Sequence, residues 1–220
     1  MPTATQQILG AAAAVPWLEI IKTAAPVVTA WIAFKALRNW QRQDRAKREA
    51  EFLDGLIDAV HLHVVEMQRP VQLLRAAKIG MASHVNSWEP GEEEGRVLAG
   101  AIAYIRERGA DDGKRLRDAL VAIESGVVRL KSLAVKGRIF QFSDYKLCHD
   151  AIAKLTWNFG RLNAFNSVIE NPTWNWKHEE VSSLLGKVMK IEPDEILAEL
   201  RTENSAIIAF VRDSYGRIYG

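Results

Sequence analysis

An apolar segment followed directly by a basic one constrains this chain more than any other feature. Residues 17–37 are mostly apolar. The cations at the end of this segment and beyond it are Lys35, Arg38, Arg42, Arg45, Lys47 and Arg48, and one acid, Asp44, lies among them. A membrane helix that leaves the bilayer on the cytoplasmic side has this apolar-then-basic order. The sequence therefore predicts a membrane anchor at residues 1–37 of a single-pass inner-membrane protein, with the N-terminus outside and the C-terminal domain cytoplasmic.

The predicted anchor is interrupted by Glu19, Lys22, Pro26 and Lys35, so its uncharged centre covers only residues 23–34. A helix needs about 20 residues to cross a hydrocarbon core of about 30 Å. Long charged side chains near helix ends can reach the headgroups, which lowers their cost. A spanning helix, a helix lying in the membrane surface and a packed oligomer core therefore remain open. The apolar side chains predicted to anchor the segment are Trp17, Ile20, Ile21, Val27, Val28, Trp31, Ile32 and Phe34.

Residues 38–51 are almost wholly polar and predict a solvated helical stalk. Asp44 with Arg48 and Arg45 with Glu49 are spaced i,i+4, which favours ion pairs along a helix. Four cations, spaced three and four apart, share one helix face. These residues, which we expect to contact anionic lipid headgroups, are Lys35, Arg38, Arg42 and Arg45.

Composition limits the remaining possibilities. The chain has 220 residues and a net charge of +2. Because the cations are concentrated beside the apolar segment, the charge gives no case for a nucleic-acid partner. The single cysteine, Cys148, excludes an internal disulfide framework and agrees with a reducing compartment. Residues 52–220 are enough for one domain with its own core.

Apolar residues at helical spacing recur from Phe52 to the C-terminus, which predicts an all-α fold. The clearest pattern is Leu116, Leu120, Ile123, Val127, Leu130 and Ala134. We expect helices to end at Gly109 and Gly137 and a last helix to begin at Pro193. The predicted architecture is a membrane-associated helix at 1–37, a stalk at 38–51, and a cytoplasmic bundle of about six or seven helices at 52–220.

Polar side chains cluster on the first helix of this domain, where Asp58, His61, His63 and Glu66 are weak candidates for a metal site. Ligands three or four residues apart on a helix can converge. His61 and His63, however, differ by about 200° around a helix, so they cannot share one metal ion. Local Asp–His and His–Glu contacts are the simpler interpretation, and we expect no cofactor.

Cys148, His149 and Asp150 resemble a nucleophile, a base and an orienting acid written in a row. Neighbours on a helix point about 100° apart, so they cannot form the required hydrogen-bonded relay. Cys148 also falls on an apolar face, as a small core residue would. We therefore predict no catalytic residue.

Trp174 and Trp176 bracket an asparagine in a predicted loop. Such aromatics either form a recognition surface or close the end of a helix bundle, and the second interpretation is favoured. Tyr215 and Tyr219 near the C-terminus leave the same two possibilities open.

These observations predict a membrane-anchored helical interaction or regulatory protein. Its expected partners are the lipid bilayer, its anionic headgroups, further copies of the chain and an unknown protein. Thr23, Thr29, Ala30 and Ala33 give the anchor small side chains for self-association. One alternative is an effector whose N-terminal helices form a pore lined by Glu19 and Lys22. A second is a metal-binding or enzymatic bundle.

Overall fold

The computed structural model describes the backbone of residues 15–86 and 92–220, and their side chains except those of residues 15–21 and 23. These described residues are almost entirely helical and contain no strand, which confirms the all-α prediction. The chain divides into two compact units, Met1–Glu49 and Ala50–Gly220. We call the first the arm and the second the bundle. Helix α2 (Val15–Glu66) contributes residues to both units.

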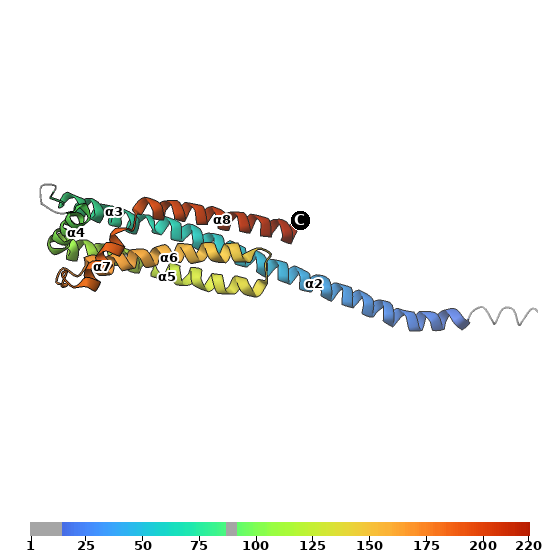
Figure 1. The fold of residues 1–220 in the computed structure, drawn as a ribbon. Helices are drawn as coiled ribbons and strands as arrows, with labels where there is room; N and C mark the ends of the chain where they lie inside the picture. The colour runs from blue at the N-terminus through green and yellow to red at the C-terminus, as the bar shows by residue number, and fades with distance from the viewer. Residues whose placement is uncertain (1–14, 87–91) are drawn as a thin grey trace, which may run out of the picture. The chain divides into compact units, whose positions relative to one another are not determined.

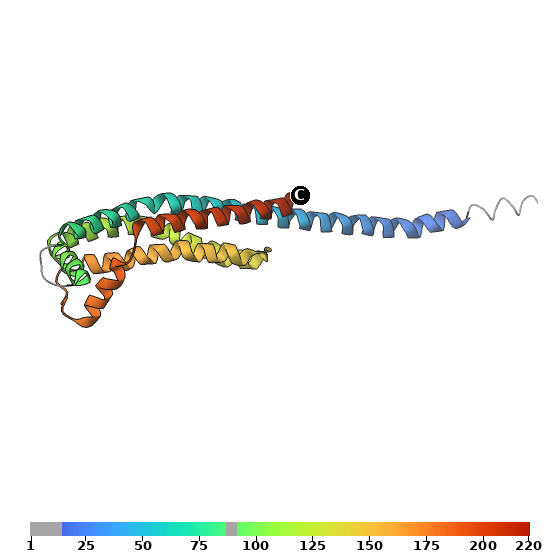
Figure 2. The same ribbon diagram turned by 45° about the horizontal axis from the view of Figure 1, so that its top comes forward.

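Helices follow one another closely through the bundle (Figure 1). After α2 come α3 (Gln68–Ser83), α4 (Glu93–Tyr104), the π-helical segment η1 (Ile105–Gly109), α5 (Ala110–Phe140), α6 (Tyr145–Ile169), α7 (Glu179–Met189) and α8 (Pro193–Tyr219). The predicted start of α8 is confirmed, with Pro193 in its first turn and acids directly after it. Phe140 is separated from Tyr145 by a short turn, and α5 and α6 run side by side in both views (Figure 2).

Four long rods make up the bundle, namely the bundle part of α2 with α3, then α5, α6 and α8. Neighbouring rods are antiparallel, so the topology is up-down-up-down. Side-chain contacts show these directions. Between α5 and α6, Arg117 contacts Glu170 and Arg138 contacts His149; between α6 and α8, Lys154 contacts Glu203 and Arg161 contacts Glu195. Between the first rod and α8, Asp54 contacts Tyr215 and Arg75 contacts Asp194. Helices α4 and α7 lie together at one end, and the α5–α6 turn lies at the other (Figure 1).

The core is formed by the apolar faces that the periodicity predicts. All six positions of the pattern from Leu116 to Ala134 are buried, as are Leu53, Leu56 and Met67 at the start of the bundle. At the end with the α5–α6 turn, aromatic rings close the core. Phe52 lies 5.1 Å from Phe140 and 5.6 Å from Phe142, measured between ring centroids.

Gly109 and Gly137 do not end helices, which corrects the prediction for both. The chain passes through Gly109 from η1 into α5, and α5 continues beyond Gly137 to Phe140. A Cβ atom at Gly109 would lie 2.3 Å from the carbonyl oxygen of Ile169, and one at Gly137 would lie 2.1 Å from the ring of Tyr145. Gly109 is therefore needed for the close packing of η1 against α6, and Gly137 for that of α5 against Tyr145 at the start of α6.

The membrane-spanning part of the prediction is not supported. Of the helices that the described residues form, none has both the length and the apolar content to cross a bilayer. The physical reason lies in the charges at Lys22 and Lys35, because the uncharged residues 23–34 between them cover only about 18 Å of helix.

Candidate functional site

The arm exposes its apolar side chains instead of packing them. Every side chain from residue 24 to residue 43 is exposed. Trp31 and Trp40 each keep 61% of their surface, and Phe34 keeps 57%. The remaining exposed apolar residues here are Val27, Val28, Ile32 and Leu37. A run of exposed large apolar side chains marks a contact with a membrane or a partner.

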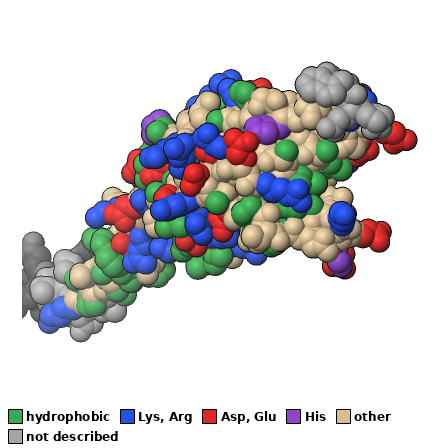
Figure 3. All heavy atoms as spheres, turned by 90° about the vertical axis from the view of Figure 1, so that its left-hand side faces the viewer, with side chains coloured by type: hydrophobic (Ala, Val, Ile, Leu, Met, Phe, Trp, Pro, Cys, Tyr) green, Lys and Arg blue, Asp and Glu red, His purple; other side chains and the backbone are tan. Residues whose placement is uncertain are grey.

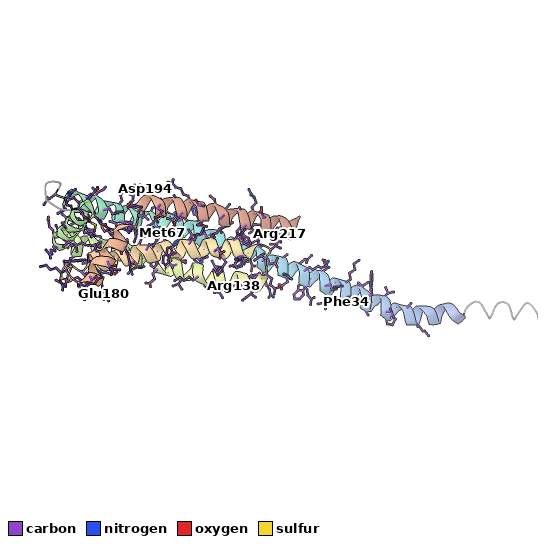
Figure 4. All side chains as sticks on the ribbon, viewed as in Figure 1. Phe34, Met67, Arg138, Glu180, Asp194 and Arg217 are labelled. Atoms are coloured by element: carbon purple, nitrogen blue, oxygen red, sulfur yellow. The ribbon has the colours of Figure 1, made fainter. Side chains whose placement is uncertain are left out.

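Cations lie directly over aromatic rings of the arm. The Lys35 ammonium is 5.1 Å from the centroid of the Trp31 ring, and the Arg38 guanidinium is 5.5 Å from that of Phe34. Each pair is spaced i,i+4 and so lies along one side of the helix. Figure 4 labels Phe34 on this part of α2. The contacts place aromatic and cationic groups where an apolar layer would meet a polar one.

Two of the predicted ion pairs form in the basic part of the arm. Arg45 contacts Glu49 at 2.7 Å, and Arg48 contacts Asp44 at 2.7 Å. Within the part of the chain that the structure describes, no carboxylate pairs with Lys35, Arg38 or Arg42. Of the four predicted headgroup cations, these three therefore keep their charge unpaired, whereas Arg45 is partly neutralised.

Other predicted groups of the arm can be placed only in part. The side chains of Trp17, Glu19, Ile20, Ile21 and Thr23 lie outside the described residues. Lys22 is exposed. The Thr29 hydroxyl donates a hydrogen bond of 2.8 Å to the carbonyl oxygen of Ala25 in its own helix. The Thr29 hydroxyl therefore already donates its hydrogen bond within its own helix and not to another copy of the arm.

The four metal candidates on α2 face different environments. Asp58 and His61 are exposed, Glu66 is half-buried, and His63 is fully buried. Among residues 15–86 and 92–220, no group of three or more His, Cys, Asp and Glu side chains is placed to hold a metal ion. Burial lowers the pKa of His63, and the nearby backbone of Leu155 acts in the opposite direction with a smaller effect. This imidazole is thus held neutral in the core.

Cys148 lies in the core, 1% exposed, and burial raises the pKa of its thiol to about 12. A thiol with this pKa carries almost no thiolate near neutral pH, so it is a poor nucleophile. His149 Nε2 accepts a hydrogen bond of 2.7 Å from Arg138, and its Nδ1 lies 3.6 Å from an Asp150 carboxylate oxygen, so neither of these two ring contacts is with the Cys148 thiol. The structure therefore does not assemble these neighbours into a relay.

Trp174 and Trp176 lie against the end of the bundle that carries α7. Trp176 is buried in the core cluster, and its Nε1 donates a hydrogen bond to the carbonyl oxygen of Pro172. Trp174 is half-buried, with its ring centroid 6.1 Å from that of Trp176. Most of this aromatic surface is therefore used in packing, and the exposed remainder belongs to Trp174.

A polar seam between α6 and α8 was not predicted. Asn158, fully buried, donates a hydrogen bond of 2.8 Å to Glu199, and Lys154 contacts the buried Glu203 at 2.7 Å. Arg161 contacts Glu195 at 2.5 Å. The partners pair in opposite chain order, so the seam fixes the antiparallel register of the two helices. The only sequence signal is polar residues at spacings of three and four on both helices, which also fits a solvated face.

A mainly apolar cavity of about 600 Å³ lies between α3, α4 and α7. Met81, Val97, Leu98 and Met189 contribute to its walls. Lys78 lies at its edge, where its ammonium donates to the carbonyl oxygens of Met189 at 3.1 Å and Ile191 at 3.0 Å. Figure 3 shows this end of the bundle, where hydrophobic and charged side chains are interspersed. The cavity suits an apolar group better than a charged one.

Comparison with known proteins returns no match, either to a protein-family model, to a curated protein or to a solved structure.

Proposed function

We propose that this chain is a membrane-tethered helical interaction protein whose arm binds anionic lipid and whose bundle recruits a partner. The observation that carries the proposal is the exposed apolar surface of residues 24–34, followed on the same helix by the unpaired cations Lys35, Arg38 and Arg42. Acyl chains would cover the apolar surface, and lipid phosphates would neutralise the cations.

Charge favours lipid over a second arm as the main contact. Aligning two arms in parallel would bring Lys35, Arg38 and Arg42 beside the same cations of the other copy, which is repulsive. Anionic headgroups offset this repulsion. Self-association of the arm is therefore proposed only as an addition to lipid binding, in which the apolar segments pack once the cations are neutralised.

The polarity of the arm changes along the helix axis more than around it. Uncharged residues 23–34 cover about 18 Å, whereas the hydrocarbon core is about 30 Å thick. We therefore propose that the apolar segment enters the bilayer obliquely without crossing it, while the cations stay at the headgroups. The anionic cytoplasmic leaflet is the proposed surface.

The bundle supplies the partner-binding part of the proposal. The cavity between α3, α4 and α7 has a volume within the usual range for ligand sites. Its mainly apolar lining would take apolar side chains of a protein partner. Membrane attachment would then concentrate this partner near the bilayer.

Vesicle flotation tests the proposed lipid contact. The full chain should float with vesicles that contain anionic phosphatidylglycerol and not with pure phosphatidylcholine. Replacing Lys35, Arg38 and Arg42 by glutamate should strongly reduce flotation. The matched control, Lys177→Glu with Lys187→Glu and Lys190→Glu, makes the same change in net charge on the bundle and should float like the native chain. Equal flotation of both triple variants would refute the proposal.

Alkaline carbonate extraction of cell membranes tests the depth of insertion. An arm that does not cross the bilayer should be released into the supernatant. Retention of the full chain in the pellet would show instead that the arm spans the membrane.

A further inference from the structure

Helix α5 carries an apolar stripe on an exposed outer face, about 100° around the helix from the residues that form the core. Val121, Val128 and Val135 are spaced by seven residues, and Ile139 follows four residues later. Seven residues turn a helix by about 700°, so these side chains lie almost in line. They are 62%, 62%, 64% and 76% exposed. By contrast, α3 and α8 each expose one large aliphatic side chain, Ile79 and Ile208.

The part of the stripe from Val128 to Ile139 is basic and lacks acids, whereas the exposed Glu124 lies beside its first residue, Val121. Between Glu124 and Asp144 the charged residues are Arg129, Lys131, Lys136 and Arg138. Arg138 is engaged by His149, and Figure 4 labels it near the C-terminal end of α5. Within the described residues, no acid pairs with Arg129, Lys131 or Lys136, and all three are exposed. From Val128 to Ile139 the apolar stripe is thus flanked by cations without compensating carboxylates.

This charge pattern distinguishes between possible occupants. If a second copy packed along the stripe, its own Arg129, Lys131 and Lys136 would face these cations and repel them. An anionic lipid surface complements them, because phosphates neutralise the cations while the Val and Ile side chains enter the acyl boundary. The stripe ends at the same end of the bundle as Phe52, since Phe140 lies 5.1 Å from it.

We infer that the outer face of α5 is a second lipid-contact surface, through which the bundle itself lies on an anionic membrane. This inference extends the proposed membrane tether and rests on it, but it concerns residues that the arm does not contain. It assigns Val128, Val135 and Ile139 to the acyl boundary and Arg129, Lys131 and Lys136 to lipid phosphates.

The test uses full-length chains with one surface cysteine, Val135→Cys, labelled with an environment-sensitive fluorophore. Matched chains carry the label at Ile208→Cys on α8 or at Trp31→Cys on the arm. The native chain, whose Cys148 is buried, serves as the control for unwanted labelling. Vesicles of phosphatidylcholine with phosphatidylglycerol should shift the emission of the label at 135 to the blue, and leave the label at 208 unchanged. Pure phosphatidylcholine should shift neither.

Charge dependence sharpens the test. Changing Arg129, Lys131 and Lys136 to glutamine should weaken the response at position 135 by about a hundredfold in lipid concentration, since each of the three cations near an anionic surface contributes about a factor of five. An unchanged response would overturn the assignment of these cations.

Each remaining outcome separates this inference from the proposed function. A response at position 31 without one at 135 would overturn the inference and leave the arm as the lipid contact. A response at 135 without one at 31 would support the inference and refute the arm. No emission shift at either position would refute both the inference and the proposed arm contact. A concentration-dependent shift at 135 without vesicles would show that a second copy covers the stripe, and would overturn the lipid assignment.

Discussion

The two units of this chain use the same helix in opposite ways. In the arm, residues 24–43 of α2 expose every side chain, including Trp31 and Trp40. In the bundle, the continuation of α2 buries Leu53, Leu56 and Val60 and leaves Asp54 and Asp58 on the same helix exposed. One helix is therefore a free surface over part of its length and a core element over the rest.

This difference shows that helical backbone and tertiary stability have separate sources. The arm has good helix formers and the ion pairs Asp44–Arg48 and Arg45–Glu49, which act within one helix. Such pairs are worth only about 0.2–0.5 kcal/mol each. The bundle gains its stability from burial of apolar faces, about 25 cal/mol per Å². An arm helix should therefore open readily, whereas the bundle should unfold as a unit.

Core truncation should show the largest difference between the two units. Leu155→Ala removes a fully buried side chain and should lower the free energy of unfolding by about 2–5 kcal/mol. Ile32→Ala, at an exposed arm position, should change it by less than about 0.5 kcal/mol. Urea denaturation followed by circular dichroism measures both. Comparable losses would show that the arm is part of the cooperative unit.

Glycine substitutions should give the next largest effect. Gly109→Ala places a Cβ 2.3 Å from the Ile169 carbonyl oxygen and should destabilise the bundle by about 1–3 kcal/mol. Gly160→Ala meets nothing within 4 Å and should stabilise it by about 0.5–1 kcal/mol through helix propensity. The same urea titration separates them. A stabilising Gly109→Ala would contradict the close contact between η1 and α6.

A pH effect should be smaller and confined to the bundle. Burial lowers the pKa of His63 from its ordinary value of 6.5, so the unfolded chain binds a proton at higher pH than the folded chain. Stability should therefore fall as pH falls through 6.5 towards the lowered pKa of the folded state. His63→Leu should reduce this dependence, and His61→Leu, at an exposed position, should leave it unchanged. Thermal melts between pH 7.5 and 5.5 provide the measurement. Identical pH slopes in both variants would contradict the assignment.

Sequence patterns predicted the helices of the bundle well, and the contacts between those helices poorly. The period of Leu116 to Ala134 identified the buried face of α5, and Pro193 identified the start of α8, because both signals are local. The prediction that a helix ends at Gly109 was wrong because glycine occurs both at helix ends and where two helices touch. Only the position of Ile169 in the fold shows that Gly109 is of the second kind. The burial of His63 was equally hidden, since its environment comes from distant parts of the chain.

The sequence was less informative about the surfaces. The arm was recognisable from its apolar-then-basic order, yet this order alone does not give the depth of insertion. The helical period of α5 predicts its buried face, and the exposed valines of the stripe lie outside that period. Their seven-residue spacing, together with the absence of acids between Glu124 and Asp144, is a signal that the sequence does contain.

Hydrogen exchange of the full chain, resolved along the sequence and measured with and without anionic vesicles, tests the central claim most directly. We predict that amides of residues 24–43 exchange rapidly in buffer and slowly on vesicles, whereas core amides of α5, α6 and α8 are slow in both. Rapid exchange of the arm on vesicles would contradict the membrane contact. Slow exchange of the arm in buffer would contradict the claim that nothing packs against it before the membrane does.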